Sequence, residues 1–579
     1  MNEEVISPRS SLQRFHYLAL VAASLIYLLI VAGDFARRTG MGLDVPQWLL
    51  APSVMIVALA GVYAWRSYRH QRWISRPLLI SLLVILMQVF LAAQRLLPSA
   101  HSGLIAAYSS SALLVHGLVL TSTVVAFRYD RQHRAIPTFE TPFSRLVLVV
   151  VAMTFFSLVS GAVETTSGAA AICQGWLLCS ENLLPRNALE WIRLLHRLSV
   201  GVNGVLILVL FVQGWRTQKH RTPNLVLVTS AFVLFFGQGL VGAAMSTRNF
   251  PIELIGLHSA TATALWAVLT VLAVHAGLST PANRSPTYQY AGWREKARDF
   301  VALTKPIIVL LLLVTTLGGM IVGAQAWPRF AVVFWTLIGG ALAAGGSGAI
   351  NQFIDRDLDK LMRRTAKRPL ASRRLTPAEG LAFGVGLCLL SFYLLAVFTN
   401  LLAALLAVAG MFYYVWVYSI LLKRSTVQNI VIGGGAGAIP PLVGWAAATG
   451  SLSLPAILLF LIIFFWTPPH FWALALLRAK EYEKGGIPMM PVVRGERETR
   501  KQILIYSVEL VFLTLIGPWL GIGSGLYFVS ALVLGAILLS LAWRLWKQGY
   551  TPKLAYRTYR YTSMYLALLF LAMVVDALV

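Results

Sequence analysis

Residues 351–370 read NQFIDRDLDKLMRRTAKRPL and follow directly on a long apolar run. Asn351, Asp355 and Asp359 are spaced i, i+4 and i+8, so on a helix their side chains share one face. Two carboxylates and an amide on one face suit Mg²⁺, which takes its remaining ligands from water and substrate phosphates. The alternative is a solvated, charged helix end at a membrane surface. Asp357 points off the shared face and fits that alternative.

A second polar segment and a basic cluster favour a binding site. Residues 479–494 read AKEYEKGGIPMMPVVR and also follow an apolar run, with Glu481 and Glu483 as a second possible metal position. Arg363, Arg364, Lys367 and Arg368 directly follow the first acidic face. Two acidic helix ends that face one another would bind a diphosphate through bridging Mg²⁺. The basic side chains would neutralise the departing diphosphate.

The composition places both segments in a membrane protein. The chain has 579 residues, 48 Lys plus Arg and 22 Asp plus Glu, for a net charge of +26, but only 12% of residues are charged and 58% are hydrophobic. Its mean hydropathy is +0.73. A soluble domain carries roughly 25% charged residues, so the positive charge does not indicate a nucleic-acid binder. Disordered, collagen-like and disulfide-scaffold classes are excluded too.

Apolar runs of membrane-spanning length predict an all-α polytopic protein. We count about 17 candidate spans of about 20 residues each, about eight between residues 17 and 278 and about nine between 305 and 579. Backbone amides in lipid need internal partners, which requires helices. The join at 279–304 has no apolar run. We therefore predict domains at 1–278 and 305–579 with 279–304 as linker, and the first domain repeats a span–loop–span rhythm.

Basic residues predict the orientation in a cell membrane. Every second loop is rich in Lys and Arg, which is typical of cytoplasmic loops. This alternation places the N-terminus and the segments at 351–370 and 479–494 inside, and the C-terminus outside. Arg37 and Arg38 are exceptions in an otherwise Lys- and Arg-poor outer loop.

Asn351-x-x-x-Asp355-x-x-x-Asp359 resembles the first signature of the UbiA superfamily of intramembrane prenyltransferases. Further stretches resemble the protoheme IX farnesyltransferase (heme O synthase) family over roughly 300–579. They are LTKPIIVLLLL (303–313), RRTAKRPL (363–370), LLKRSTVQNIVIGGGAGAIPPLVGW (421–445), WTPPHFWALAL (466–476) and EYEKGGIPMMPVV (481–493). The resemblance implies a nine-helix UbiA-type domain that transfers a farnesyl group from farnesyl diphosphate to the vinyl group of heme B.

The same resemblance implies roles for individual residues. Asn351, Asp355 and Asp359 are expected to hold Mg²⁺–diphosphate, together with Glu481, which stands where the family commonly has Asp. Contact with the diphosphate is expected from basic residues, namely Lys305, Arg363, Arg368, Lys423 and Arg424. His470, in TPPHFW within a span, either contacts the porphyrin or is a hydrogen-bonded residue of the bundle.

The first half contains intramembrane histidines suited to heme ligation. His116, His196 and His258 are the candidates, against the alternative of hydrogen-bonded interior histidines. Cys173 and Cys179 lie six positions apart in an outer loop, where a disulfide or a redox-active pair is plausible. GDFARRTGMGLDVPQW and CQGWLLC…LLHR resemble the first outer loop and the cysteine loop of heme A synthase over about 17–278. That family has a His pair in each half-bundle, but residues 47–65 contain no histidine.

Several functions stay open from the sequence. The first half either oxidises heme O to heme A or binds and delivers heme. The second half is either a heme O synthase or a prenyltransferase for another acceptor, such as a quinone precursor. A non-enzymatic heme-binding or delivery protein is the third possibility. Expected partners are heme B, farnesyl diphosphate, the bilayer and terminal oxidase assembly factors, with no nucleic acid.

Overall fold

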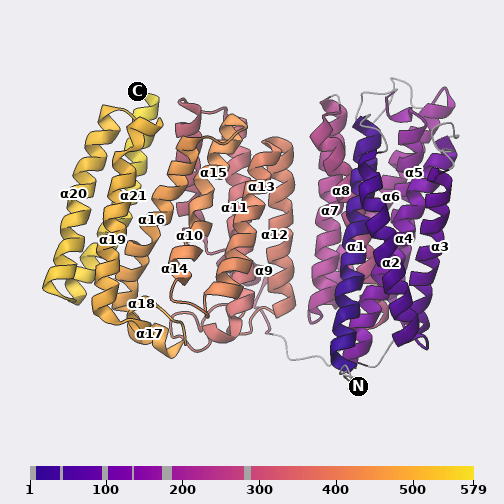
Figure 1. Ribbon diagram of the computed structural model, residues 1–579, viewed down its shortest axis with the longest axis horizontal. Helices are drawn as coiled ribbons and strands as arrows, with labels where there is room; N and C mark the ends of the chain where they lie inside the picture. Colours follow the sequence, from indigo (N-terminus) through magenta and orange to yellow (C-terminus); the bar gives the residue numbers. More distant parts are fainter. Residues whose placement is uncertain are drawn as a thin grey trace, which may run out of the picture. The chain divides into compact units, whose positions relative to one another are not determined.

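The computed structural model describes residues 8–39, 44–93, 102–132, 136–171, 185–248, 250–279 and 288–579. Over these ranges the regular structure is helical, with no strand, which confirms the all-α prediction (Figure 1). The chain divides into two compact units, Met1–Ser285 and Pro286–Val579.

Unit 1 consists of eight long helices within its described residues. Two groups of four, α1–α4 and α5–α8, each pack neighbour on neighbour, with further contacts between α4, α1 and α8. This matches the repeated rhythm of the sequence. The helices are α1 (Pro8–Thr39), α2 (Asp44–Tyr68), α3 (Arg72–Ala93), α4 (Ser102–Gln132), α5 (Pro142–Thr166), α6 (Ala188–Thr217), α7 (Thr222–Thr247) and α8 (Ile252–Gly277).

Unit 2 combines long helices with short helices that gather at one end. The long ones are α10 (Pro306–Ala324), α11 (Phe330–Asp359), α12 (Pro377–Phe398), α13 (Leu401–Phe412) continued by the π-helix η2 (Tyr413–Leu422), α15 (Gly435–Thr449), α16 (Leu454–Leu477), α19 (Gly495–Leu515), α20 (Gly525–Gln548) and α21 (Pro552–Leu578). The short ones are α9 (Trp293–Leu303), α14 (Asn429–Gly433), α17 (Ala479–Lys484) and α18 (Met490–Val493).

Fifteen helices of the described chain are long and apolar enough to cross a membrane. They include all long helices of both units except α2 and α19. The N-terminal turns of α19 carry Glu496, Arg497, Glu498, Arg500 and Lys501, which shortens its apolar part. The sequence estimate of about 17 spans counted these two helices as well.

The predicted linker contains a helix. Within 279–304, residues Trp293–Leu303 form α9, which packs against α11 and α12 of unit 2. The sequence missed it because a short, charged helix has no apolar run of spanning length. Its charged face instead contacts other charged residues of unit 2.

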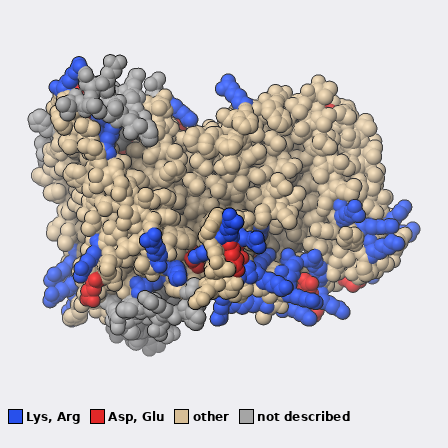
Figure 2. Space-filling view, turned by 180° about the vertical axis from the view of Figure 1, so that it is seen from behind, with Lys and Arg blue, Asp and Glu red and all other residues tan. Residues whose placement is uncertain are grey.

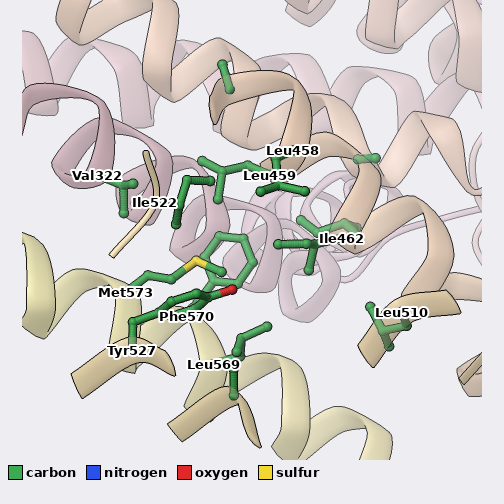
Figure 3. Close-up of a cluster of buried hydrophobic side chains, with 14 of the residues drawn as sticks. Val322, Leu458, Leu459, Ile462, Leu510, Ile522, Tyr527, Leu569, Phe570 and Met573 are labelled. Carbon is green, nitrogen blue, oxygen red and sulfur yellow. The ribbon is translucent and has the colours of Figure 1, made fainter. Parts of the chain in front are cut away.

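Close crossing of α10 and α15 anchors the core of unit 2. A Cβ on Gly444 would lie 2.0 Å from Thr316 O, and one on Gly319 would lie 2.3 Å from Pro441 O. Only glycine allows the two backbones to approach so closely. Figure 3 shows the adjoining apolar cluster, where Tyr527, Phe570 and Met573 pack with leucines of α16. The buried Tyr527 hydroxyl donates to Thr514 O at 2.7 Å.

Candidate functional site

A cavity of about 160 Å³ opens at the end of unit 2 where the short helices gather. Figure 2 shows that Lys and Arg side chains of this unit concentrate towards the same end of its helices. The cavity brings together residues from positions 305 to 489 of the chain. Its wall consists of Lys305, Asn351, Asp355, Asp359, Met362, Arg364, Thr365, Arg368, Tyr414, Tyr418, Lys423, Ile430, Phe471, Tyr482, Ile487 and Met489.

The last turns of α11 supply the acidic wall. Asn351, Asp355 and Asp359 are 3%, 1% and 2% exposed, so the residues that share a helix face also share one buried side of the cavity. Asn351 Nδ2 donates to Asp355 Oδ2 and to Ser419 Oγ, each at 3.0 Å. These bonds orient the amide so that its carbonyl oxygen faces Lys305.

Basic side chains meet each of these polar groups. Lys305 Nζ donates to Asn351 Oδ1 at 2.7 Å, Lys423 Nζ donates to Asp355 Oδ2, and Arg368 Nη1 donates to both carboxylate oxygens of Asp359. Arg424 lies farther out, with Nη2 3.9 Å from Asp355 Oδ1 and its side chain 54% exposed. Two buried carboxylates are thus compensated by cations, as burial of charge requires.

The π-helix η2 directs side chains of the opposite cavity wall towards the acidic residues of α11. In a π-helix the backbone N–H donates to the carbonyl oxygen five residues earlier, as Lys423 N donates to Tyr418 O at 2.9 Å. Nine residues make 2.5 turns of an α-helix, so Tyr414 and Lys423 would point to opposite sides. A π-turn takes one residue more, so the same nine residues make about two turns and both side chains reach the cavity. π-Helical turns occur frequently at functional sites.

Three residues expected from the sequence do not line the cavity. Arg363 and Glu481 are exposed and absent from its wall, as is Arg424. Their immediate neighbours Arg364, Tyr482 and Lys423 line it instead. The turn geometry between α11 and α12, and the direction of the short α17, decide which of two adjacent side chains points inward. Sequence spacing alone does not show which of two neighbours points inward. Arg364 and Arg368, four positions apart, both line the cavity.

The oxygen set of α11 fits Mg²⁺. Asp355 Oδ1 is buried and has no hydrogen-bond partner among the described residues, so an acceptor is available in the acidic wall of the cavity. No group of three or more His, Cys, Asp or Glu side chains over the described ranges forms a ready-made metal cage. This pattern is typical of Mg²⁺ sites, which use one or two carboxylates and complete the shell with water and phosphate oxygens.

The remaining wall of the cavity is apolar and aromatic. Met362, Ile430, Phe471, Ile487 and Met489 line it, so one cavity offers charged groups on one side and hydrocarbon on the other. Tyr482 adds a hydroxyl. Burial raises the pKa of Tyr482 above its ordinary value of 10.0, which keeps the phenol protonated as a hydrogen-bond donor.

His470 of α16 lies outside this cavity wall, and its side chain packs against α21. Its ring stacks on Trp466 at 4.3 Å and lies 4.8 Å from Tyr559. Nδ1 is 2.9 Å from Thr562 Oγ1, and that hydroxyl donates to Tyr559 O at 2.7 Å. A Thr562 hydroxyl that donates to Tyr559 O accepts from Nδ1, and in that tautomer Nε2 presents its lone pair.

In unit 1, His196 shows the same arrangement. Its Nδ1 lies 2.8 Å from Ser160 Oγ, and Ser160 Oγ is 2.8 Å from Ser157 O. Nε2 is 3.6 Å from Glu164 Oε2. Gly161 lies against this ring, since a Cβ there would be 3.0 Å from His196 Cε1.

The other sequence candidates of unit 1 are partly described. Gly242 of α7 lies against His258, with a built Cβ 3.3 Å from its Cε1. His116 is 2% exposed, and within the described chain its Nδ1 has no hydrogen-bond partner. Cys173 and Cys179 lie outside the described residues, as do the side chains of Arg37 and Arg38.

Comparison with known proteins identifies the relatives of both units. Residues 312–571 match the model of the UbiA prenyltransferase family, and residues 186–364 match a model described as cytochrome oxidase assembly protein. A protoheme IX farnesyltransferase of Roseiflexus castenholzii is 43% identical over 452 residues, covering 74% of this chain and 83% of that protein. The chain belongs to the protoheme IX farnesyltransferase family.

A second sequence relative agrees with this membership. The protoheme IX farnesyltransferase of Symbiobacterium thermophilum is 51% identical over 281 residues, covering 48% of this chain and 94% of its own. A solved digeranylgeranylglyceryl phosphate synthase covers 49% of this chain and 99% of its own length, at 17% identity and a TM-score of 0.43.

Membership in the protoheme IX farnesyltransferase family, together with the many apolar helices, makes this a multi-pass membrane protein and a prenyltransferase. The Roseiflexus match is longer than either unit, so it extends into both. The UbiA match begins at residue 312 and therefore leaves out Lys305 and α9, although Lys305 lines the cavity.

Proposed function

We propose that unit 2 transfers a farnesyl group from farnesyl diphosphate to a vinyl group of heme B, giving heme O and diphosphate. The observation that carries this proposal is the cavity of unit 2, in a chain of the protoheme IX farnesyltransferase family. There a buried Asn–Asp–Asp face meets four basic side chains and an apolar wall. An allylic diphosphate has matching parts, because its head is polyanionic and its tail is hydrocarbon.

Asn351, Asp355 and Asp359 would hold Mg²⁺, which supplies charge neutralisation to the diphosphate when bound. Lys305, Arg364, Arg368 and Lys423 surround the same volume and would contact the phosphate oxygens. These cations bind the leaving group more strongly as negative charge develops on it, which lowers the barrier to bond cleavage.

The proposed reaction breaks one C–O bond and forms one C–C bond and one new C–O bond. The C1–O bond of the allylic diphosphate breaks, and its electron pair leaves with the diphosphate. The terminal vinyl carbon forms the new C–C bond to C1. The positive charge left on the inner vinyl carbon is captured by water, which loses a proton and remains as a hydroxyl group. The apolar wall around Phe471 and Ile430 excludes other water from the allylic cation before it is attacked.

The deciding experiment measures the products of the purified protein. Heme B, Mg²⁺ and farnesyl diphosphate are supplied, and hemes are resolved by mass. Heme O is the expected product. No heme product, with prenylated hydroxybenzoate when that acceptor is offered, would instead support a prenyltransferase for quinone precursors. Absence of turnover on both acceptors would leave a non-enzymatic heme-binding protein.

His470 is proposed to contact heme B through Nε2. Support comes from the hydrogen bond at Nδ1, because metal-binding histidines commonly have their second nitrogen fixed in this way. Its packing between Trp466 and Tyr559 equally suits a residue of the bundle. Heme B affinity of His470→Ala, measured by absorption titration, separates the two. Unchanged affinity would rule out the heme contact.

For unit 1 we propose heme binding through His196 and His258, with His116 as a further ligand candidate. The glycines that lie against both rings favour this function. Purified wild type is expected to show a bis-imidazole heme spectrum that His196→Ala and His258→Ala lose. Appearance of heme A under oxidising conditions would add catalysis, whereas heme retention without heme A would indicate delivery.

Three further proposals follow from the sequence. The protein lies in the cell membrane with its N-terminus and the cavity of unit 2 on the cytoplasmic side. Reporter fusions after Val579 would test this orientation.

Cys173 and Cys179 are proposed to form a disulfide. The mass of the protein after thiol alkylation, with and without reductant, would test it. Terminal oxidase assembly factors are proposed partners, to be sought by co-purification.

A further inference from the structure

The helix α9 is connected to two separate cations of the cavity wall of unit 2, Lys305 and Arg368. Its C-terminal end leads into Lys305, and its charged face contacts the segment that follows Arg368. Nothing in the chemistry proposed above requires α9, and the family match begins after it. Its contacts nevertheless fix the backbone on both sides of the site.

The first contact holds the junction between α9 and α10. Lys305 has φ 56° and ψ 61°, a left-handed conformation that is uncommon for a residue other than glycine. Gln352 is 2% exposed, and its Nε2 donates to Ala302 O at 3.1 Å and Leu303 O at 3.0 Å. The side chain therefore satisfies the last carbonyls of α9 and fixes the turn from which Lys305 reaches Asn351.

Glycines of α11 allow the junction to approach this closely. A Cβ on Gly348 would lie 3.2 Å from Thr304 O, and one on Gly345 would lie 3.0 Å from Thr304 Cβ. Gly345, Gly348 and Gln352 are spaced i, i+3 and i+7 and so share one side of α11. This helix thus presents Asn351 and the two aspartates to the cavity and contacts the junction with another side.

The second contact holds the segment between α11 and α12. Asp299 of α9 is 7% exposed and accepts from Arg374 Nε at 2.7 Å and Nη2 at 2.8 Å. The Tyr290 hydroxyl donates to the same carboxylate at 3.0 Å. Arg374 N donates to Pro369 O at 2.9 Å, so the ion pair is connected to the residue directly after Arg368.

A second ion pair strengthens this contact. Lys296 Nζ donates to Glu379 Oε1 at 2.6 Å, and the Glu379 side chain is 3% exposed. Glu379 also forms the capping box of α12 with Thr376. Two ion pairs with buried carboxylates thus join one face of α9 to residues 374–379. Breaking a buried pair by removing one partner is costly, because the other charge stays uncompensated.

We infer that α9 positions the diphosphate-binding cations of unit 2. Asp299 fixes the segment that carries Arg368 through Arg374, and Gln352 fixes the turn that carries Lys305. Asp299 and Gln352 are positioning residues, since neither lines the cavity. This inference rests on the proposed diphosphate site, but it concerns binding and not the identity of the acceptor.

The experiment measures binding of pyrophosphate with Mg²⁺ to the purified full chain by calorimetry. Asp299→Asn keeps the shape of the side chain and removes its charge, and Gln352→Met keeps its length and removes the two donated hydrogen bonds. Each is expected to weaken pyrophosphate binding about tenfold, which corresponds to about 1.4 kcal/mol, with heme B affinity unchanged. Asp299→Glu is expected to recover part of the loss.

The matched control is Asp357→Asn, the same substitution at an acid of α11 that is 69% exposed and pairs with Lys360 at the surface. It is expected to bind pyrophosphate like wild type. Binding is referred to folded protein, quantified by size-exclusion chromatography. If Asp299→Asn and Gln352→Met lower the yield of folded protein but bind with wild-type affinity, the inference is overturned. Heme O formation by wild type tests the proposed function separately.

Discussion

Arg368 Nη1 lies 2.9 Å from Oδ1 and 2.8 Å from Oδ2 of Asp359, so one cation bridges both oxygens of a carboxylate proposed to hold Mg²⁺. The carboxylate is 2% exposed, whereas the arginine side chain is 25% exposed. The same arginine lines the cavity and is placed to contact diphosphate. The pair therefore implies competition between the guanidinium and a metal ion for Asp359.

Arg368→Ala separates these two roles of the arginine. It is expected to lower heme O formation about 100-fold, because a charge-assisted contact to the leaving group is lost. Binding of Mn²⁺ in the absence of diphosphate is expected to become tighter, since Asp359 is released. Free Mn²⁺ measured by electron paramagnetic resonance checks this. Unchanged Mn²⁺ affinity would show that the arginine and the metal do not compete.

Asp355→Ala is expected to abolish heme O formation while the protein stays in the membrane. It removes a metal ligand and leaves Lys423, whose side chain is only 14% exposed, without its anion. The loss is expected to be on the order of 100-fold or more, the size of effect that charge stabilisation at a transition state can supply. Asp357→Ala on the same helix is the control. Full activity of Asp355→Ala would refute the metal assignment.

The sequence expectation and the structure place different neighbours, Arg363 and Arg364, at the diphosphate site. The sequence and its family resemblance selected Arg363, but Arg364 lines the cavity. Arg364→Ala is therefore expected to raise the KM for farnesyl diphosphate about tenfold, and Arg363→Ala to change it by less than about twofold. Steady-state kinetics on both variants is sufficient. The opposite ranking would mean that the turn after α11 is oriented differently when substrate binds.

These neighbours illustrate what the sequence could predict. Asn351, Asp355 and Asp359 were found because regular α-helical spacing converts positions into a common face. Tyr414 and Tyr418 were missed because the π-helix changes the number of residues per turn, and no local pattern announces it. Arg364 and Tyr482 were missed because irregular turns and short helices orient side chains through tertiary contacts.

The same distinction applies to the fold. Long apolar helices were predictable because lipid requires continuous backbone hydrogen bonding and about 20 apolar residues. The helix α9 was not, because it is short and charged, and its partners Arg374 and Glu379 lie about 80 positions away. Such contacts become visible only when the segment between α11 and α12 is placed.

Tyr482→Phe tests a cavity residue that the sequence did not single out. Loss of one hydroxyl donor is expected to lower kcat/KM about fivefold, in line with about 1 kcal/mol for one hydrogen bond. Burial raises the pKa of Tyr482, which favours the neutral phenol in the folded protein. The ratio of wild-type to variant activity should therefore stay constant below pH 10 and fall only as pH rises beyond it. Glu481→Gln is expected to lower kcat/KM by a smaller factor than Tyr482→Phe. A ratio that already changes near neutral pH would contradict this role.

Gly444→Ala tests the close crossing of α10 and α15 on which the cavity depends. The added Cβ would lie 2.0 Å from Thr316 O and 2.9 Å from Thr316 C. Backbone atoms cannot rotate away as a flexible side chain can, so the two helices must separate, at a cost of about 1–3 kcal/mol or more. We expect a lower midpoint of thermal unfolding in detergent and reduced heme O formation.

Gly437→Ala provides the matched control for Gly444→Ala within the same helix. A Cβ on Gly437 meets nothing within 4 Å, and alanine favours a helix interior by about 1 kcal/mol over glycine. Its midpoint is therefore expected to equal or exceed that of wild type. If both alanine variants have the same midpoint of thermal unfolding, the stability of this crossing depends on helix propensity and not on the distance between the backbones of α10 and α15.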